Sequence, residues 1–197
     1  MTISMEDIKK LRAMTGAGMM DVKNALEETG GNLEKAVQLL RERGIAKAAK
    51  KAERAAKEGF VGSYLHHNGK IATLLELNCE TDFVARNEQF QTLARNIAMH
   101  VAMANPSYRS RDEVPAEVLE AERAILAKQA KEEGKPEPVI AKIVEGRLNK
   151  FFAEQCLLEQ RFIKDDSKTI EEIVKEAIAT IGENIQVGRF ARIAIGE

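Results

Sequence analysis

Candidate nucleophiles and acid–base residues are few in this 197-residue chain and lie apart in the sequence. Cys79 ends a β-prone run with no base beside it, and a lone cysteine at a strand end is usually structural. His66 and His67 border a turn, where polar loop residues are more common than catalysts. Gly16-Ala17-Gly18 lacks the spacing of a phosphate-binding loop and fits a turn between helices. An enzyme that uses Cys79 and His66 stays open as an alternative, but we expect no enzymatic activity.

The cysteines, the histidines and the distribution of charge indicate whether disulfides, a metal site or nucleic-acid binding are expected. Cys79 and Cys156 have no Cys-x-x-Cys spacing, and we expect two free, buried thiols. Three histidines are too few and too poorly spaced for a zinc site, so we expect no metal and no cofactor. Residues 1–57 carry twelve Lys and Arg against eight Asp and Glu, in a chain of net charge −1. This asymmetry is too mild to indicate direct nucleic-acid binding.

The composition is that of a globular protein with a solvated surface, at 44% hydrophobic and 31% charged residues. No apolar run approaches the roughly 20 residues that a membrane-spanning helix needs. The first ten residues are acidic and polar, where a secretory signal has a basic start and an apolar run. We therefore expect a cytoplasmic protein without membrane contact.

Two adjacent methionines are more typical of a protein contact than of catalysis. Met19 and Met20 stand at the start of a predicted helix, where neighbouring side chains point about 100° apart. Both cannot face the same small core equally well, so we expect one of them to be exposed. Exposed methionine suits a protein contact because it is flexible and polarisable. The alternative is that both lie partly buried at the edge of the core.

The corner Thr81-Asp82-Phe83-Val84 joins a predicted strand to a predicted helix. Either Thr81 or Asp82 can cap the helix through its side-chain oxygen. Phe83 falls in the first turn, where a side chain either folds onto the core or projects outward. Local physics alone favours a buried phenylalanine.

Residues 1–45 predict a compact module of three short helices, followed by a helical linker at residues 46–58. The linker is rich in alanine, lysine and arginine, and its basic residues are more typical of a solvated face than of a specific acidic contact. The capping and stopping residues of the three helices are, in chain order, Ser4, Gly16, Gly30-Gly31, Asn32 and Gly44.

Residues 59–197 predict an α+β domain in which an antiparallel sheet packs against helices. Two β-prone runs flank Asn68-Gly69, a strong hairpin signal, and the strictly alternating residues 185–195 predict a closing strand. Helices are expected between them, at residues 90–104, after Pro115, at 139–156 with an interruption at Gly146 left open, and at 169–181.

Several motifs in this order resemble the bacterial elongation factor Ts family. Thr15-Gly16-Ala17-Gly18-Met19-Met20-Asp21, followed by Lys23, Ala25 and Leu26, resembles its N-terminal signature. Glu76-Leu77-Asn78-Cys79-Glu80-Thr81-Asp82-Phe83-Val84-Ala85 resembles its second signature. Residues 47–52, 97–102 and 144–147 also fit, so the resemblance covers nearly the whole chain. It implies that the three-helix module has a ubiquitin-associated-type fold.

The resemblance implies a guanine-nucleotide exchange factor that binds elongation factor Tu, GDP-bound or nucleotide-free, and promotes GDP release in translation. In the family the module docks on the partner's nucleotide-binding domain, through residues that correspond here to Arg12, Met19 and Met20. Asp82 and Phe83 match an insertion element whose phenylalanine wedges between partner side chains and disturbs the Mg²⁺ and phosphate site. The implied partner-binding residues are Arg12, Met19, Met20, Thr81, Asp82, Phe83 and Val84.

Longer family members carry a second core half and an inserted coiled coil, and we expect this chain to lack both. Residues 62–66 resemble a stretch from the second half of those long members. Short members pair two copies of the core, so the resemblance implies a homodimer that uses the sheet and the strand at 185–195. The alternative function is a ubiquitin-associated-type scaffold without exchange activity, in which Asp82 and Phe83 are structural.

Overall fold

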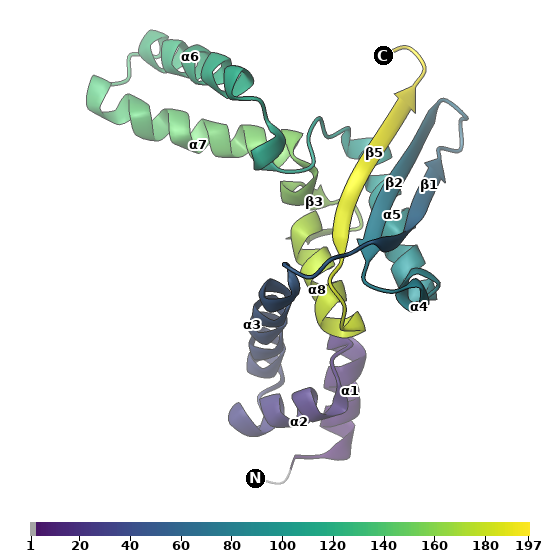
Figure 1. Ribbon diagram of the computed structural model, residues 1–197. Coiled ribbons are helices and arrows are strands. Elements are labelled where there is room, and N and C mark those ends of the chain that lie inside the picture. Colours follow the sequence, from purple (N-terminus) through teal and green to yellow (C-terminus); the bar gives the residue numbers. More distant parts are fainter. Residues whose placement is uncertain (1–2) are drawn as a thin grey trace. The chain divides into compact units, whose positions relative to one another are not determined.

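The computed structural model describes residues 3–197, and the chain forms two compact units built from interleaved segments (Figure 1). The first unit contains the N-terminal segment up to Phe60 together with Leu77–Thr92 and Glu172–Gln186. The second contains Val61–Glu76, Leu93–Glu171 and Val187–Glu197. Helices and a small antiparallel sheet packed on them confirm the predicted α+β class.

The first unit begins with the predicted three-helix module, formed by α1 (Met5–Thr15), α2 (Met19–Glu28) and α3 (Leu33–Lys51). Its predicted caps are confirmed: Ser4 accepts a hydrogen bond from the Asp7 amide, and Gly16 ends α1 in a left-handed conformation with φ 66°. The module has a core of its own, made of Ile8, Leu11, Val22, Ala25, Leu26, Ala36 and Leu40.

The predicted stop of the third helix at Gly44 is wrong, because α3 continues unbroken to Lys51. A glycine inside a helix costs only about 1 kcal/mol relative to alanine, which packing can offset. Here the missing side chain has a use: a Cβ at Gly44 would lie 3.2 Å from the Cβ of Ala179 in α8 (Ile170–Ile181). Gly44 therefore allows α8 to approach α3 closely. The division into module (1–45), linker (46–58) and core (59–197) stays a prediction.

The sheet has the strand order β1 (Glu58–Leu65), β2 (Ile71–Cys79) and β5 (Gln186–Ala194) (Figure 1). The predicted hairpin turn is confirmed, with Gly69 at φ 69° and the His66 amide donating to the Ile71 carbonyl at 2.8 Å. A further two-stranded antiparallel hairpin, β3 (Arg161–Phe162) with β4 (Asp165–Thr169), was not predicted. Its strands are too short to show an alternating pattern.

Helix α5 (Glu88–Ala104) belongs to the second unit from Leu93 onward, and this part of it covers one face of the sheet. One contact from each strand identifies this face, and the pairs are Gly62 with Ala94, Thr73 with Ala98, and Arg192 with Ala102. At Gly62 the approach is so close that an added Cβ would meet the Ala94 carbonyl at 2.6 Å. Because side chains alternate along a strand, the neighbours of these residues lie on the opposite face.

Helices α6 (Ala116–Glu132) and α7 (Glu137–Gln155) run side by side (Figure 1). Only residues 133–136 separate them, and so short a connection makes them antiparallel. Gly146 does not interrupt α7. The seam between the helices buries Leu126, Ala130, Ile140, Val144 and Leu148. The buried residues recur at four-residue spacing along both helices, so the antiparallel pair has a core of its own. The expected absence of the coiled coil of longer family members stays a prediction.

Three further findings concern properties expected from the sequence. Cys79 and Cys156 are free and buried, as predicted. Within residues 3–197, no helix has the length and apolar character to cross a membrane. No group of three or more potential metal-ligating side chains occurs in that part of the chain either.

Candidate functional site

The corner after β2 exposes Phe83, whose side chain is 81% accessible to solvent. Thr81 caps the single turn α4 (Asp82–Ala85), and its hydroxyl accepts a hydrogen bond from the Val84 amide at 3.4 Å. The preference of local physics for a buried Phe83 is therefore wrong. The inward position of the turn is taken by Ala85, which is 8% exposed, and Phe83 lies about 200° from it around the helix axis.

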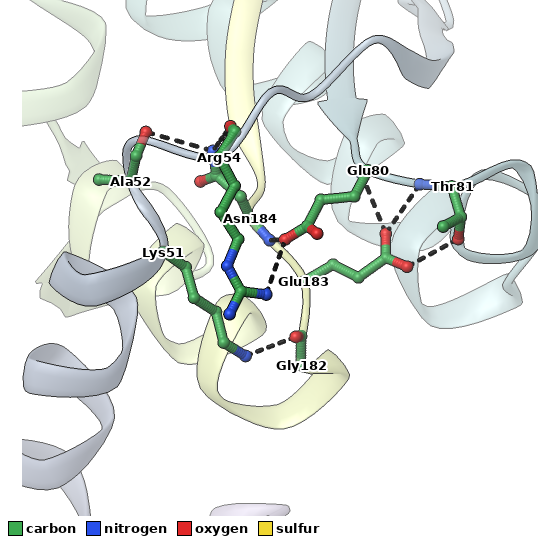
Figure 2. A network of polar contacts seen from close by, with 8 residues as sticks. All are labelled: Lys51, Ala52, Arg54, Glu80, Thr81, Gly182, Glu183 and Asn184. Atoms are coloured by element: carbon green, nitrogen blue, oxygen red, sulfur yellow. Dashed lines mark hydrogen bonds and ion pairs between the residues drawn. The ribbon is translucent and has the colours of Figure 1, made fainter.

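The carboxylate of Glu183 binds this corner from the loop between α8 and β5 (Figure 2). Its Oε2 accepts hydrogen bonds from the amides of Glu80 and Thr81, both at 3.0 Å. Its Oε1 accepts a third hydrogen bond from the Thr81 hydroxyl at 2.6 Å. One side chain thus satisfies two backbone donors at the end of the strand and orients the hydroxyl that caps α4.

A second branch of the network ties the corner to the end of α3 (Figure 2). The Glu80 carboxylate accepts a hydrogen bond from the Asn184 amide at 2.7 Å and lies 3.5 Å from the Arg54 guanidinium. The side chain of Asn184, only 1% exposed, donates to the Arg54 carbonyl at 2.7 Å. Lys51, the last residue of α3, donates to the Gly182 carbonyl. Three segments far apart in the sequence are joined here by polar contacts.

The other residues of the corner are less constrained. Asp82 forms an ion pair with Arg86 one turn later, at 2.9 Å, and both side chains are substantially exposed. An exposed pair at this spacing contributes about 0.3–0.5 kcal/mol, so a binding partner can replace it at little cost. Val84 is half-buried beside it. Asp82, Phe83 and Val84 are therefore accessible to another protein to different degrees.

The module carries the second set of predicted contact residues. Met19 and Met20 are 46% and 66% exposed, so the prediction that one of them is exposed holds for both. The buried stripe of α2 begins one turn later, at Val22, which leaves its first turn outside the core. Arg12, in the last turn of α1, is also exposed. In the described part of the chain, these side chains form no hydrogen bond or ion pair with the corner.

Comparison with known proteins decides the family. The family model described as "Elongation factor TS" matches residues 2–197. The chain belongs to the elongation factor Ts family. Proteins named "Elongation factor Ts" from Geobacter sulfurreducens and Fervidobacterium nodosum are 56% and 57% identical to the whole chain, which covers 91% and 100% of them. One from Thermosipho melanesiensis is 58% identical over 195 residues, 99% of this chain and 100% of the relative.

The likeness to elongation factor Ts motifs did not reveal the residues that support the corner. Glu80 belongs to the second signature, but nothing in the sequence links it to Asn184, 104 positions away. The available signal was Gly182, which adopts φ 93° and marks a turn between the last helix and the closing strand. Such a turn places Glu183 in a loop between these two elements, but it does not predict which backbone amides the Glu183 carboxylate contacts.

The alternative enzyme interpretation used Cys79 and His66, and in this elongation factor Ts family member Cys79 is buried and His66 is half-buried. Burial, with a smaller effect from the negative charge of Glu183, raises the pKa of the Cys79 thiol to about 11. A thiol of this pKa is protonated at neutral pH and is therefore a weak nucleophile. Its Sγ donates to the Thr81 carbonyl at 3.2 Å, and His66 Nδ1 lies 3.0 Å from the Tyr64 hydroxyl. The Cys79 thiol is thus buried and contacts the corner as a hydrogen-bond donor.

Proposed function

We propose that this chain is a guanine-nucleotide exchange factor that binds elongation factor Tu and promotes GDP release during translation elongation in the cytoplasm. Membership of the elongation factor Ts family supports the choice of partner and the role in translation. The observation that carries the proposal is the exposure of Phe83, 81% accessible on a corner held by several hydrogen bonds. The protein changes the nucleotide affinity of its partner and breaks no covalent bond itself.

In the proposed mechanism Phe83 inserts as a wedge between partner side chains near the Mg²⁺ and phosphate site. A large apolar side chain left in water gains free energy when a protein interface buries it. If the pocket that accepts Phe83 opens only when GDP is loosely held, this gain favours the nucleotide-free partner. By linkage, the factor then weakens GDP binding by the same ratio as GDP weakens binding of the factor. Asp82 supports the wedge with a polar contact.

The module supplies the second contact of the proposal. Arg12, Met19 and Met20 dock on the nucleotide-binding domain of the partner. The two methionines supply adaptable apolar surface, 46% and 66% exposed in the free chain, and Arg12 supplies a charged hydrogen-bond donor. Their contribution is to affinity, whereas Phe83 acts on the nucleotide site. A plain binding module needs only contacts that give affinity. An exchange factor also needs a contact that acts on the nucleotide site, and here that contact is Phe83.

The proposal is tested by the release of fluorescent GDP from elongation factor Tu, chased with unlabelled GDP. Substoichiometric amounts of the chain should accelerate release in proportion to their concentration, because an exchange factor turns over. An unchanged release rate, measured with chain that binds the partner, would leave only the scaffold alternative. A matched mixture with an unrelated protein of similar charge controls for non-specific effects.

We also propose that the chain forms a homodimer through the sheet face that α5 leaves uncovered. Alternation from the α5-contacting residues puts Val61, Leu65, Leu74 and Ile193 on this face, and they are 58%, 67%, 54% and 71% exposed. The solvent face of an antiparallel sheet is ordinarily polar. A second copy offers an identical apolar face, which suits a two-fold symmetric interface.

Light scattering coupled to size exclusion should give twice the chain mass of 21.9 kDa. Leu74→Glu places a charge on the proposed interface and should shift the mass toward one chain. Gln129→Glu, on the exposed surface of α6, adds the same charge elsewhere and should leave the dimer intact. A wild-type mass of one chain at micromolar concentration would refute the dimer without affecting the exchange proposal.

A further inference from the structure

The turn that carries Phe83 cannot hold its own shape. Helix α4 has four residues, and so short a helix is not stable by itself. The conformational entropy lost in forming the first turn exceeds the free energy gained from its hydrogen bond. The Phe83 ring, 81% exposed, has little packing to fix its direction. The Thr81 cap is long, at 3.4 Å from hydroxyl to Val84 amide. The presentation of Phe83 therefore depends on contacts from outside the turn.

The strongest of these outside contacts come from Glu183. Charge-assisted hydrogen bonds are shorter and stronger than neutral ones, and Glu183 makes three, at 2.6, 3.0 and 3.0 Å. The Thr81 hydroxyl donates its only proton to Glu183, so its lone pairs remain to accept from the Val84 amide. The carboxylate thus sets the direction of the cap as well as the path of the backbone (Figure 2).

We propose that Glu183 is a positioning residue that holds the Thr81 corner and so presents Phe83 in one fixed orientation. The effect of this positioning on GDP release rests on the proposed function, whereas the hydrogen bonds of Glu183 exist in the free chain without any partner. A corner ordered before binding loses less conformational entropy when Phe83 becomes immobilised in an interface. The Glu80 and Asn184 branch anchors the same loop to the chain after α3, which keeps Glu183 itself in place.

The first arm of the test is NMR relaxation on the free protein, with Glu183→Gln as the variant. The amide cannot accept with both of its heavy atoms, so at least one of the three hydrogen bonds is lost. The backbone order parameters of residues 82–85 should fall from about 0.85 toward 0.6, with the rest of the chain unchanged. Glu53→Gln removes the same charge from an exposed site near α3 and should change nothing. Unchanged order in Glu183→Gln overturns the proposal.

The second arm measures GDP release from elongation factor Tu. Loss of the fixed orientation should lower exchange efficiency about 3- to 10-fold, the range expected from ordering one side chain on binding. In a Phe83→Ala background, Glu183→Gln should have almost no further effect, because the carboxylate acts through Phe83. Equal losses in both backgrounds would show a general structural role and overturn the proposal.

Two further outcomes separate the inference from the proposed function. If Glu183→Gln does not fold, Thr81→Val keeps the shape and removes only the hydroxyl, and it should loosen residues 82–85 in the same way. If wild-type chain does not accelerate GDP release at all, the proposed function fails. The order parameters of the free protein then decide the positioning role of Glu183 without reference to the partner.

Discussion

Truncation of Phe83 to alanine should leave the fold almost unchanged and remove most of the exchange activity. The side chain is 81% exposed, so most of its apolar surface already contacts water in the free protein. Surface truncations of this kind change the free energy of unfolding by no more than about 0.5 kcal/mol. Phe90 is the matched control, because it is 0% exposed and lies at the start of α5. Its truncation should cost about 3–5 kcal/mol of stability.

For GDP release we expect the opposite ranking of the two truncations, with Phe83→Ala having the larger effect and Phe90→Ala the smaller. An aromatic residue buried at the centre of an interface contributes about 2–4 kcal/mol when truncated. If that contribution acts on the transition state for GDP release, the rate falls roughly 30- to 900-fold, since each 1.36 kcal/mol is a factor of ten. Phe90→Ala should lose activity only in proportion to the fraction of chain that is unfolded.

Urea unfolding followed by circular dichroism gives the stability of both variants, and stopped-flow release of fluorescent GDP gives their activity. The expected pattern is a stable, inactive Phe83→Ala and a destabilised Phe90→Ala whose folded fraction is active. A Phe83→Ala variant that unfolds would show that the ring stabilises the chain. One that exchanges GDP at the wild-type rate would refute the wedge.

Three further predictions concern other parts of the molecule. Replacing Met19 and Met20 with alanine should raise the concentration of chain needed for half-maximal exchange, with little change in the maximal rate; titration of the release rate distinguishes this from a lower maximum. The thiols of Cys79 and Cys156, both with pKa values raised to about 11 chiefly by burial, should resist thiol reagents at pH 8 until urea unfolds the chain, and rapid labelling would contradict their burial. Burial lowers the pKa of His100 below 6.5, so the unfolded chain takes up a proton first as the pH falls. The free energy of unfolding should therefore decrease from pH 7 toward pH 5.5, and a flat or rising profile in urea titrations would contradict the assignment.

Local sequence signals predicted the elements well where a side chain acts on its own backbone. Ser4 and Asn32 cap their helices through hydrogen bonds to amides three residues away, and Gly69 forms the hairpin turn. These interactions involve neighbours in the sequence, so residue type and spacing are sufficient to find them. Gly44 was misinterpreted for the opposite reason. Its role is to let Ala179 of a distant helix approach, and no local pattern distinguishes that from a helix stop.

In the candidate site as well, the sequence indicated the residues that belong to local motifs but not those that contact them from distant parts of the chain. The two signatures indicated Met19, Met20 and the corner at Thr81, and the exposure of Phe83 agrees with the resemblance rather than with local physics. The supporting network escaped prediction because its bonds span more than 100 positions, from Glu183 to Thr81 and Glu80. The pairing of α6 with α7 was not predicted either, because the pattern of apolar residues along one helix does not show which other element covers them.

The central proposal is that the chain binds elongation factor Tu in a way that opposes the binding of GDP. Its most direct test is the dissociation constant of the complex, measured by titration calorimetry with nucleotide-free and with GDP-bound elongation factor Tu. We expect much tighter binding to the nucleotide-free partner, and a ratio of the two dissociation constants that shrinks strongly in Phe83→Ala. Equal affinity for the two states would contradict it, because a ligand that does not distinguish them cannot weaken GDP.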